Sequence, residues 1–144
     1  MGAELARRVL IADADAAIRR QLFKALLDAE VYSDCLMTVS DTLAKLDESP
    51  YGVIVLDIGL PGGEVDQVIE RIAVIPAQER PVVLILATRP EATRSLDVEI
   101  VQIVLRKPVV VSHIVDLVRS CLRSAAARHE SKRNPKKNGD QLTS

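Results

Sequence analysis

Short apolar runs alternate along the chain with longer stretches in which apolar residues recur at helical spacing. A short unbroken apolar run predicts a strand buried on both faces, whereas apolar residues three and four apart predict an amphipathic helix. Runs of the first kind predict five strands, at residues 8–12, 35–39, 53–56, 82–87 and 100–105. Because a helical stretch follows each run, the sequence predicts five β–α units and a parallel sheet covered by helices on both faces.

Polar residues with free side-chain oxygens mark the predicted starts of several helices. Asp15 is expected to cap the first helix, because its carboxylate can accept the free N–H groups of a first turn. Ser40 or Asp41 is expected to cap the second helix, and Ser112 the last one. Pro90 suits the first turn of a fourth helix, which is predicted to be short and mostly polar.

The charge balance separates the last residues from the rest. Residues 1–123 carry 14 Lys and Arg against 18 Asp and Glu, a net charge of −4, whereas residues 124–144 carry 5 against 2, a net charge of +3. The apolar stripe also ends near residue 124. The sequence therefore predicts one domain over residues 1–123 and a basic, disordered tail or linker over residues 124–144.

Cysteine content and hydropathy narrow the surroundings in which the chain works. Cys35 and Cys121 lie far apart in apolar stretches and have no metal-binding or redox spacing, which indicates two buried thiols in a reducing compartment. Asp13 ends the first apolar run early, and no run approaches the roughly 18 residues that a membrane span needs. The sequence predicts a soluble, cytoplasmic protein with no membrane partner.

Candidate chemistry lies where the predicted strands end. Asp13, Asp57, Thr88 and Lys107 follow strands one, three, four and five. In open parallel sheets, ligands bind at the carboxyl ends of the strands, near the point where the strand order reverses. Two neighbouring carboxylates attract a hard cation such as Mg²⁺, and a carboxylate can attack phosphorus to form an acyl phosphate. An ammonium and a hydroxyl can then stabilise the transferred phosphoryl group.

These stretches resemble the receiver domains of bacterial two-component response regulators. The resemblance is carried by LIADADAAIRR, VIVLDIGLPGG, VVLILAT and VLRKP, and it spans residues 8–123. The run DIGLPG that begins at Asp57 is its strongest motif, and the pair Lys107–Pro108 is the second. The resemblance implies an α/β fold with a doubly wound, five-stranded parallel sheet in the order 2-1-3-4-5, flanked by five helices in the flavodoxin-like receiver arrangement. It also implies a cis peptide bond at Lys107–Pro108.

The same resemblance assigns roles to individual residues. Asp57 would be the phosphoacceptor and a metal ligand, Asp13 an acidic ligand to Mg²⁺, and Gly59 a ligand through its backbone carbonyl. Thr88 would be the switch hydroxyl, and Lys107 would bind the phosphoryl group. The implied partner is a sensor histidine kinase or a phosphotransfer protein. The implied protein is a phosphorylated signalling switch rather than an enzyme, since it catalyses only its own phosphorylation and dephosphorylation.

Two positions depart from the receiver pattern. Ala14 stands where the family usually places a second acid, and Asp15, one residue later, is a helix cap by prediction and a metal ligand only as an alternative. We therefore expect weak Mg²⁺ binding, because affinity follows ligand charge. Val104 and Val109 replace the aromatic residues that often read out the switch, and the segment between Thr88 and Lys107 is short. The output is thus expected to differ from aromatic-coupled switching.

Several alternatives stay open at this point. The chain could be a degenerate receiver that binds a partner without phosphorylation. The run Asp13–Ala14–Asp15 also matches the short motif of haloacid-dehalogenase-type phosphatases, with Asp13 as nucleophile and Asp15 as general acid and base. The end, QLTS at residues 141–144, resembles the segment before a DNA-binding effector in nitrate-regulator-type transcription factors, so any DNA contact would come from an effector outside this chain. The sequence leaves a homodimer open.

Overall fold

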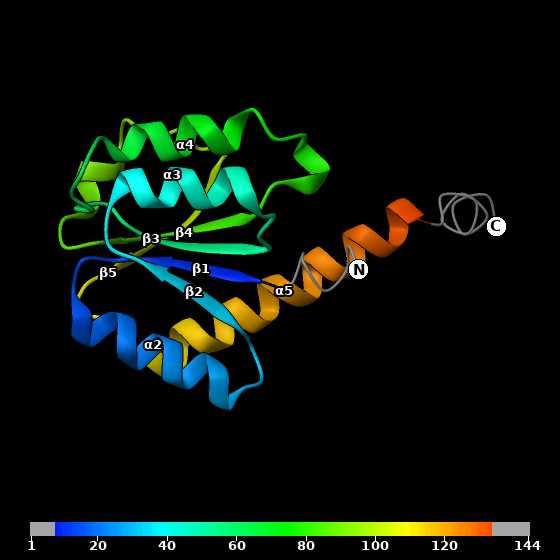
Figure 1. Cartoon of the computed structure of the whole chain (residues 1–144), viewed down its shortest axis with the longest axis horizontal. Coiled ribbons are helices and arrows are strands. Elements are labelled where there is room, and N and C mark those ends of the chain that lie inside the picture. Colours follow the sequence, from blue (N-terminus) through cyan, green and yellow to red (C-terminus); the bar gives the residue numbers. More distant parts are fainter. Residues whose placement is uncertain (1–7, 134–144) are drawn as a thin grey trace.

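The computed structural model describes residues 8–133 of the chain. They form one parallel sheet of five strands in the order β2-β1-β3-β4-β5, as predicted. Apolar side chains fill nearly every position of the three central strands, which is why those strands lie inside the molecule (Figure 1). The strands are β1 (Val9–Ala12), β2 (Ser33–Leu36), β3 (Val53–Asp57), β4 (Val82–Ala87) and β5 (Val101–Arg106).

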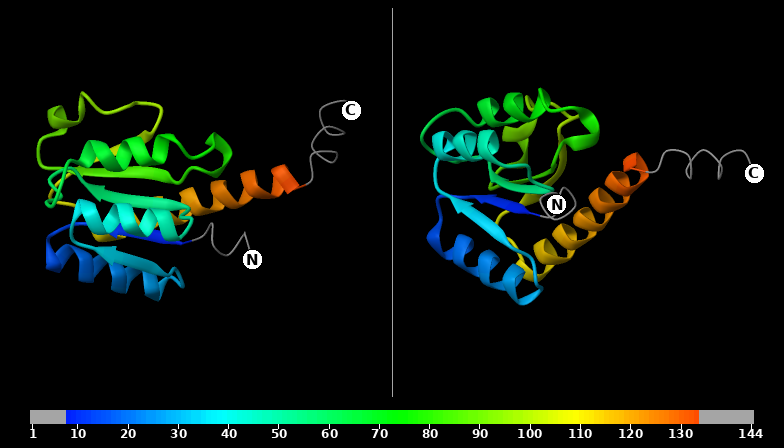
Figure 2. Two further views of the ribbon diagram at one scale, coloured as in Figure 1. Left: turned by 45° about the horizontal axis from the view of Figure 1, so that its top comes forward. Right: turned by 45° about the vertical axis from the view of Figure 1, so that its right-hand side comes forward.

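Helices cover both faces of this sheet and divide the core into two layers. Alternate residues of each central strand point to opposite faces. Leu10, Ile54 and Ile85 belong to the layer under α3 and α4, whereas Ile11, Val55 and Leu84 belong to the layer under α2 and α5 (Figures 1 and 2). The helices are α2 (Ala16–Asp28), α3 (Val39–Glu48), α4 (Val65–Ala73) and α5 (Val111–Arg133), and a short 3₁₀ helix, η1 (Ala77–Glu79), precedes β4.

The connection between β4 and β5 differs from the prediction of a fifth flanking helix. Among residues 8–133 it contains only a 3₁₀ helix, η2 (Pro90–Thr93), and the other four helices are present. Only Leu96 and Ile100 of this connection join the buried core, so it has no apolar stripe with which to pack a helix onto the sheet. Asp97 organises the rest of the turn, since its backbone carbonyl accepts hydrogen bonds from Ile100 and Val101.

Helix starts test the capping predictions. Asp15 caps α2 as expected, because its carboxylate accepts the N–H groups of Ala17 and Ile18. The prediction for α3 was wrong: Thr38 is its N-cap and accepts the N–H of Asp41. β2 therefore ends at Leu36, earlier than predicted, since the residues after it already turn into α3.

The start of α5 also differs from the prediction that Ser112 caps this helix. Ser112 lies inside α5 rather than before it, because the carbonyl of Val110 accepts the first helical hydrogen bonds.

Cys35 was expected to be buried, but it is exposed on the edge strand β2, and Cys121 is half-buried. An edge strand has a neighbour on one side only, so an apolar run there does not guarantee burial.

The predicted tail is partly helical. α5 continues to Arg133, so residues 124–133 extend the last helix instead of forming a disordered segment (Figure 2). The alanines at 125–127 have the highest helix propensity, which allows a helix to continue where its apolar stripe has ended. The remaining residues of the predicted tail, 134–144, lie outside the described residues. No helix within residues 8–133 is both long enough and apolar enough to cross a membrane.

Candidate functional site

The carboxyl edge of the sheet brings together three of the predicted site residues. β1 and β3 are neighbours, and Asp13 and Asp57 lie at their ends. Lys107 follows β5, and its ammonium Nζ lies 3.1 Å from Asp13 Oδ2 and 3.3 Å from Asp57 Oδ2. The backbone N–H of Lys107 donates to the carbonyl of Ala87, which anchors the lysine beside the end of β4. One ammonium thus joins two carboxylates from separate strands.

Asp13 is the most buried charged group of this site, since its side chain is only 1% exposed. One oxygen, Oδ1, accepts the backbone N–H of Asp15 at 2.9 Å. The other, Oδ2, is buried and has the Lys107 ammonium as its ionic partner. Burial raises the pKa of Asp13, and the negative charge of Asp57 raises it further, against the lowering effects of the Asp15 N–H and Lys107. Ionised Asp13 is therefore held at a cost in stability.

Lys107 balances that negative charge. Burial alone would lower the pKa of Lys107, but the hydrogen bond to Asp13 and the charges of Asp57 and Asp13 outweigh it, so the pKa is raised. The lysine is consequently cationic throughout the neutral range. Its side chain is 18% exposed and that of Asp57 is 14% exposed, so the cluster is shielded but open on one side.

The two acids after β1, Asp13 and Asp15, accept hydrogen bonds from different backbone groups. Asp15 directs its carboxylate oxygen Oδ1 to the N–H groups of the first turn of α2, which confirms the predicted cap. Ala14 is exposed and adds no ligand atom beyond its backbone. Arg19 donates from Nη1 to the carbonyl of Asp13 at 2.8 Å and fixes the loop. The sequence analysis did not predict this role for Arg19. Its position six residues after Asp13, one turn into α2, could have indicated that its side chain reaches back to the loop.

The loop after β3 shapes the other side of the site. The N–H of Gly59 donates to Asp57 Oδ1 at 3.0 Å, and the N–H of Leu60 donates to the carbonyl of Asp57. Asp57 therefore keeps one oxygen on its own loop and the other on Lys107. The peptide bond Lys107–Pro108 is cis, as the resemblance implied.

Thr88 and Val104 lie at the end of β4 and within β5. Thr88 is the first residue after β4 and is exposed at the same edge of the sheet. Val104 lies within β5, opposite Ile85, and is 37% exposed. Among the described residues, the connection before β5 contains the 3₁₀ helix η2 and no α-helix.

Replacing Asp13 by asparagine should stabilise the protein at neutral pH. A carboxyl whose folded pKa is raised costs stability when ionised, and the cost disappears as the pH falls through the raised pKa. We expect a gain in the free energy of unfolding, because asparagine removes the buried charge and still accepts the N–H of Asp15. Thermal unfolding at pH 7.5 and pH 4 measures this: the gain should shrink at pH 4. Asp41→Asn, at an exposed position, is the control, and an equal gain there would contradict the prediction.

The donor set is chemically suited to a hard cation but is small. Asp13, Asp57 and the carbonyl of Gly59 supply oxygen ligands of the type that Mg²⁺ takes, and the buried Asp13 Oδ2 has lone-pair capacity left. Within residues 8–133, however, no three His, Cys, Asp or Glu side chains converge. Among the described residues, the carboxylates that meet at this edge of the sheet are those of Asp13 and Asp57.

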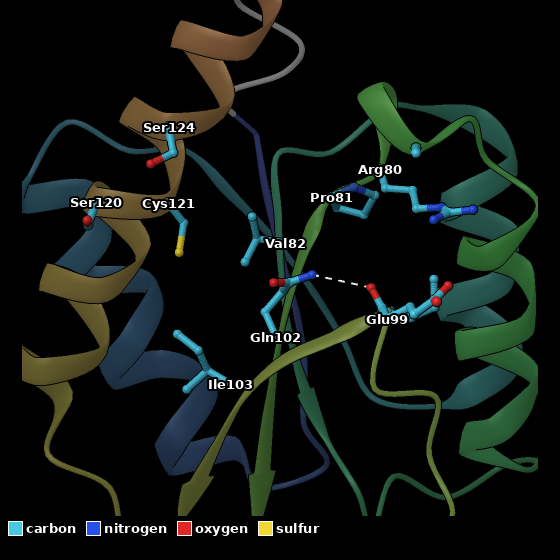
Figure 3. Close-up of a pocket in the computed structure, with 11 residues that line it drawn as sticks. Arg80, Pro81, Val82, Glu99, Gln102, Ile103, Ser120, Cys121 and Ser124 are labelled. Atoms are coloured by element: carbon cyan, nitrogen blue, oxygen red, sulfur yellow. Dashed lines mark hydrogen bonds between the residues drawn. The ribbon is translucent and has the colours of Figure 1, made fainter.

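A separate hollow lies at the other end of the sheet. It measures about 460 Å³ and is bounded by the starts of β4 and β5 and by one face of α5 (Figure 3). The guanidinium of Arg80 donates hydrogen bonds to the carbonyls of Ala73 and Ile75, and the side-chain amide of Gln102 donates to the carbonyl of Glu99. These hydrogen bonds go to nearby backbone carbonyls. The hollow lies at the opposite end of the sheet from the aspartate–lysine site.

Comparison with solved structures identifies the fold of this chain. No family model and no curated protein matches the sequence. Solved structures do match. A response regulator receiver domain protein from Methanospirillum hungatei JF-1 has 20% identity and a TM-score of 0.70 over 83% of this chain and 95% of that one. The beryllofluoride-activated NtrC4 receiver domain dimer has 21% identity and a TM-score of 0.72, covering 83% and 98%.

A third similar structure is an adenylate cyclase from Rhodopirellula baltica, which has 23% identity and a TM-score of 0.75 over 91% of this chain and 98% of that one. At these identities the likeness concerns the fold. The chain has the receiver fold of the flavodoxin-like type, and the resemblance read from its motifs is confirmed at that level.

Proposed function

We propose that this chain is a phosphoacceptor receiver of a two-component system, in which Asp57 takes a phosphoryl group from a histidine kinase or a phosphotransfer protein. The observation that carries the proposal is the position of Lys107, whose ammonium contacts both Asp57 and Asp13 at the carboxyl edge of a receiver-type sheet. On this proposal the receiver domain is residues 1–123, and the protein works in the cytoplasm as a signalling switch.

The chemistry follows from the side chains. A carboxylate oxygen of Asp57 attacks phosphorus, the bond from phosphorus to the donor nitrogen breaks, and the leaving imidazole keeps that electron pair. Lys107 compensates the negative charge that arrives on the phosphoryl oxygens. Thr88, exposed at the same edge, donates a hydroxyl to one of these oxygens and signals the state. Hydrolysis by water returns Asp57 to its carboxylate.

Mg²⁺ belongs to this proposal as a weak ligand. Asp13, Asp57 and the carbonyl of Gly59 would hold it, and when bound it would supply positive charge to the phosphoryl oxygens. With Asp13 and Asp57 ionised and Lys107 protonated, these three side chains carry a net charge of −1 before phosphorylation. Because Ala14 contributes no carboxylate, we propose that phosphorylation needs a high Mg²⁺ concentration.

Incubation with acetyl phosphate and Mg²⁺, followed by intact-mass measurement, tests the proposal. We expect one added phosphoryl group on the parent chain and none on Asp57→Asn. Ala14→Asp should increase the initial rate of adduct formation by about tenfold at low Mg²⁺, since it adds a carboxylate ligand. Asp28→Asn, an exposed acid at the end of α2 that lies away from the site, should react like the parent.

The mass measurements distinguish a receiver that is phosphorylated on Asp57 from a degenerate receiver. An adduct that persists in Asp57→Asn would refute Asp57 as the acceptor. An adduct in Ala14→Asp but not in the parent would favour the second candidate, a degenerate receiver that binds its partner without phosphorylation. Two observations favour that candidate: Ala14 lacks a ligand side chain, and Asp15 is committed to capping α2.

The haloacid-dehalogenase-type alternative has little support among the described residues. Its nucleophile would be Asp13, but that side chain is buried and paired with Lys107. Its general acid would be Asp15, which faces the first turn of α2. The proposed effector link rests on residues 141–144, which lie outside the described residues, so a role in transcription stays a prediction.

A further inference from the structure

The loop between β3 and α4, residues 58–64, connects the candidate site to the start of α3. Gly59 donates its N–H to Asp57 Oδ1 at 3.0 Å, so the carboxylate itself holds the first part of this loop. Leu60, the next residue, is 3% exposed and lies in the same buried layer as Val39, the first residue of α3. The loop is therefore attached to Asp57 and also to the core beneath α3.

Two hydrogen bonds and one close contact join the rest of the loop to the first turn of α3. The carbonyl of Pro61 accepts the N–H of Val39 at 2.8 Å, and the carbonyl of Gly62 accepts the Ser40 hydroxyl at 2.9 Å. A Cβ added at Gly63 would lie 3.0 Å from Cγ1 of Val39, so this glycine backbone lies directly against that side chain. Because close-packed groups transmit displacements, the loop moves together with the first turn of α3.

Phosphorylation of Asp57 changes the attachment of this loop. Before transfer, the ionised carboxylate has one oxygen on the N–H of Gly59 and the other on the Lys107 ammonium. When one oxygen bonds to phosphorus and the donor leaves with its electron pair, the carboxyl group loses its negative charge. Its hydrogen bond to Gly59 then weakens, because hydrogen bonds to charged acceptors are about twice as strong as neutral ones.

The connection before β5 offers no comparable route from the site. Among the described residues it contains the 3₁₀ helix η2 and no α-helix, and Leu96 and Ile100 are its contribution to the buried core. Val104, in the neighbouring strand β5, has no ring that could move between a buried and an exposed position. This side of the sheet therefore lacks a packed helix that a change at Asp57 could displace.

The first turn of α3 reaches the surface of the protein. Met37, which precedes this turn, is 52% exposed, and Ser40 and Asp41 within it are also exposed. We infer, on the basis of the function proposed above, that the phosphorylation state of Asp57 is transmitted through the β3–α4 loop to the first turn of α3. The regulated surface of this receiver is then the start of α3, and not the connection before β5.

Backbone amide NMR of the full chain, with and without acetyl phosphate and Mg²⁺, tests this inference. The intact mass of the same sample shows whether Asp57 carries the phosphoryl group. In the phosphorylated protein, the amide resonances of Gly59 and Val39 should both shift, because their hydrogen bonds join the site to the loop and the loop to α3. The resonances of Leu96 and Ile100 should shift less than that of Val39.

A pair of serine variants makes the test specific. Ser40→Ala removes the hydroxyl bond to Gly62, so the change at Val39 on phosphorylation should fall about twofold, as expected for a substitution within a coupled network. The change at Gly59 should persist in this variant, since its own bond to Asp57 is intact. Ser112→Ala, at an exposed serine in the first turn of α5, should give the same changes as the parent.

The mass separates failure of this inference from failure of the proposed function. Phosphorylated protein without a change at Val39, or with a change that Ser40→Ala leaves intact, would overturn the inference alone. Larger shifts at Leu96 and Ile100 than at Val39 would do the same and would assign transmission to the connection before β5. If the parent takes no phosphoryl group, the spectra are recorded on Ala14→Asp, and no adduct in either protein overturns both proposals.

Discussion

Replacing Lys107 by methionine should destabilise the protein by about 2 kcal/mol at neutral pH. The substitution keeps most of the apolar stem but leaves Asp13 and Asp57 ionised beside each other without a counter-ion. Breaking a fully buried ion pair costs about 3–5 kcal/mol, and the smaller figure reflects a site that is open on one side. Thermal unfolding should show a fall of roughly 4–8 °C in Tm.

The pH dependence identifies the cause of this loss. In the parent, the raised pKa of Lys107 contributes stability that is complete below the ordinary lysine pKa of 10.5 and is lost as the pH rises through the folded value. In Lys107→Met, Asp13 loses the lysine interactions that lower its pKa, so it binds a proton more readily and the difference from the parent should shrink as the pH falls from 7 towards 4. Both proteins should be measured in the same buffers by thermal or urea unfolding.

Two further variants make the test specific. Arg106→Met removes a neighbouring exposed cation at the end of β5 and should change stability by less than about 0.5 kcal/mol. Adding Asp13→Asn to Lys107→Met should recover much of the loss, because only one carboxylate then remains. A loss that is the same at pH 4 and pH 7, or that the second substitution does not reduce, would mean that packing rather than charge explains it.

The second large effect concerns Gly62, in the loop that follows Asp57. Gly62→Ala should cost about 2–3 kcal/mol, of which about 1–2 kcal/mol comes from forcing an L residue into left-handed backbone. Gly62 has a φ of +82°, and an added Cβ would lie 2.8 Å from Cβ of Thr38. Thr38 is the N-cap of α3 and cannot move freely. Urea unfolding should show a lower midpoint with an unchanged slope.

A matched glycine in the same loop is the control. At Gly59 an added Cβ would make only an ordinary 3.6 Å contact with Asp57 Oδ1, and φ there is not positive. Gly59→Ala should therefore cost less than about 1 kcal/mol, the range of small backbone effects. If the two variants lose equal stability, the contact between this loop and α3 is not the cause. That contact also includes hydrogen bonds from Val39 to Pro61 and from Ser40 to Gly62.

The sequence by itself determined the sheet and the residues at its carboxyl edge. Apolar runs must be buried on both faces, and parallel strands place their ends at one edge, so Asp13, Asp57 and Lys107 could be brought together without coordinates. Tertiary structure decided how those groups divide their bonds. Whether Asp15 caps a helix or faces a metal, and whether Arg19 reaches the carbonyl of Asp13, depends on distances that spacing does not give.

Tertiary structure also decided the features that depend on competition between segments. Thr38 rather than Ser40 caps α3 because the helix already begins at Val39, and the Ser40 hydroxyl donates to the carbonyl of Gly62 in the β3–α4 loop. The segment after Thr88 forms η2 because it has too few apolar residues to compete for the sheet face, and α5 outlasts its apolar stripe because local propensity sustains it. Burial of Cys35 failed as a prediction because strand order, which leaves β2 at an edge, is a property of the whole sheet.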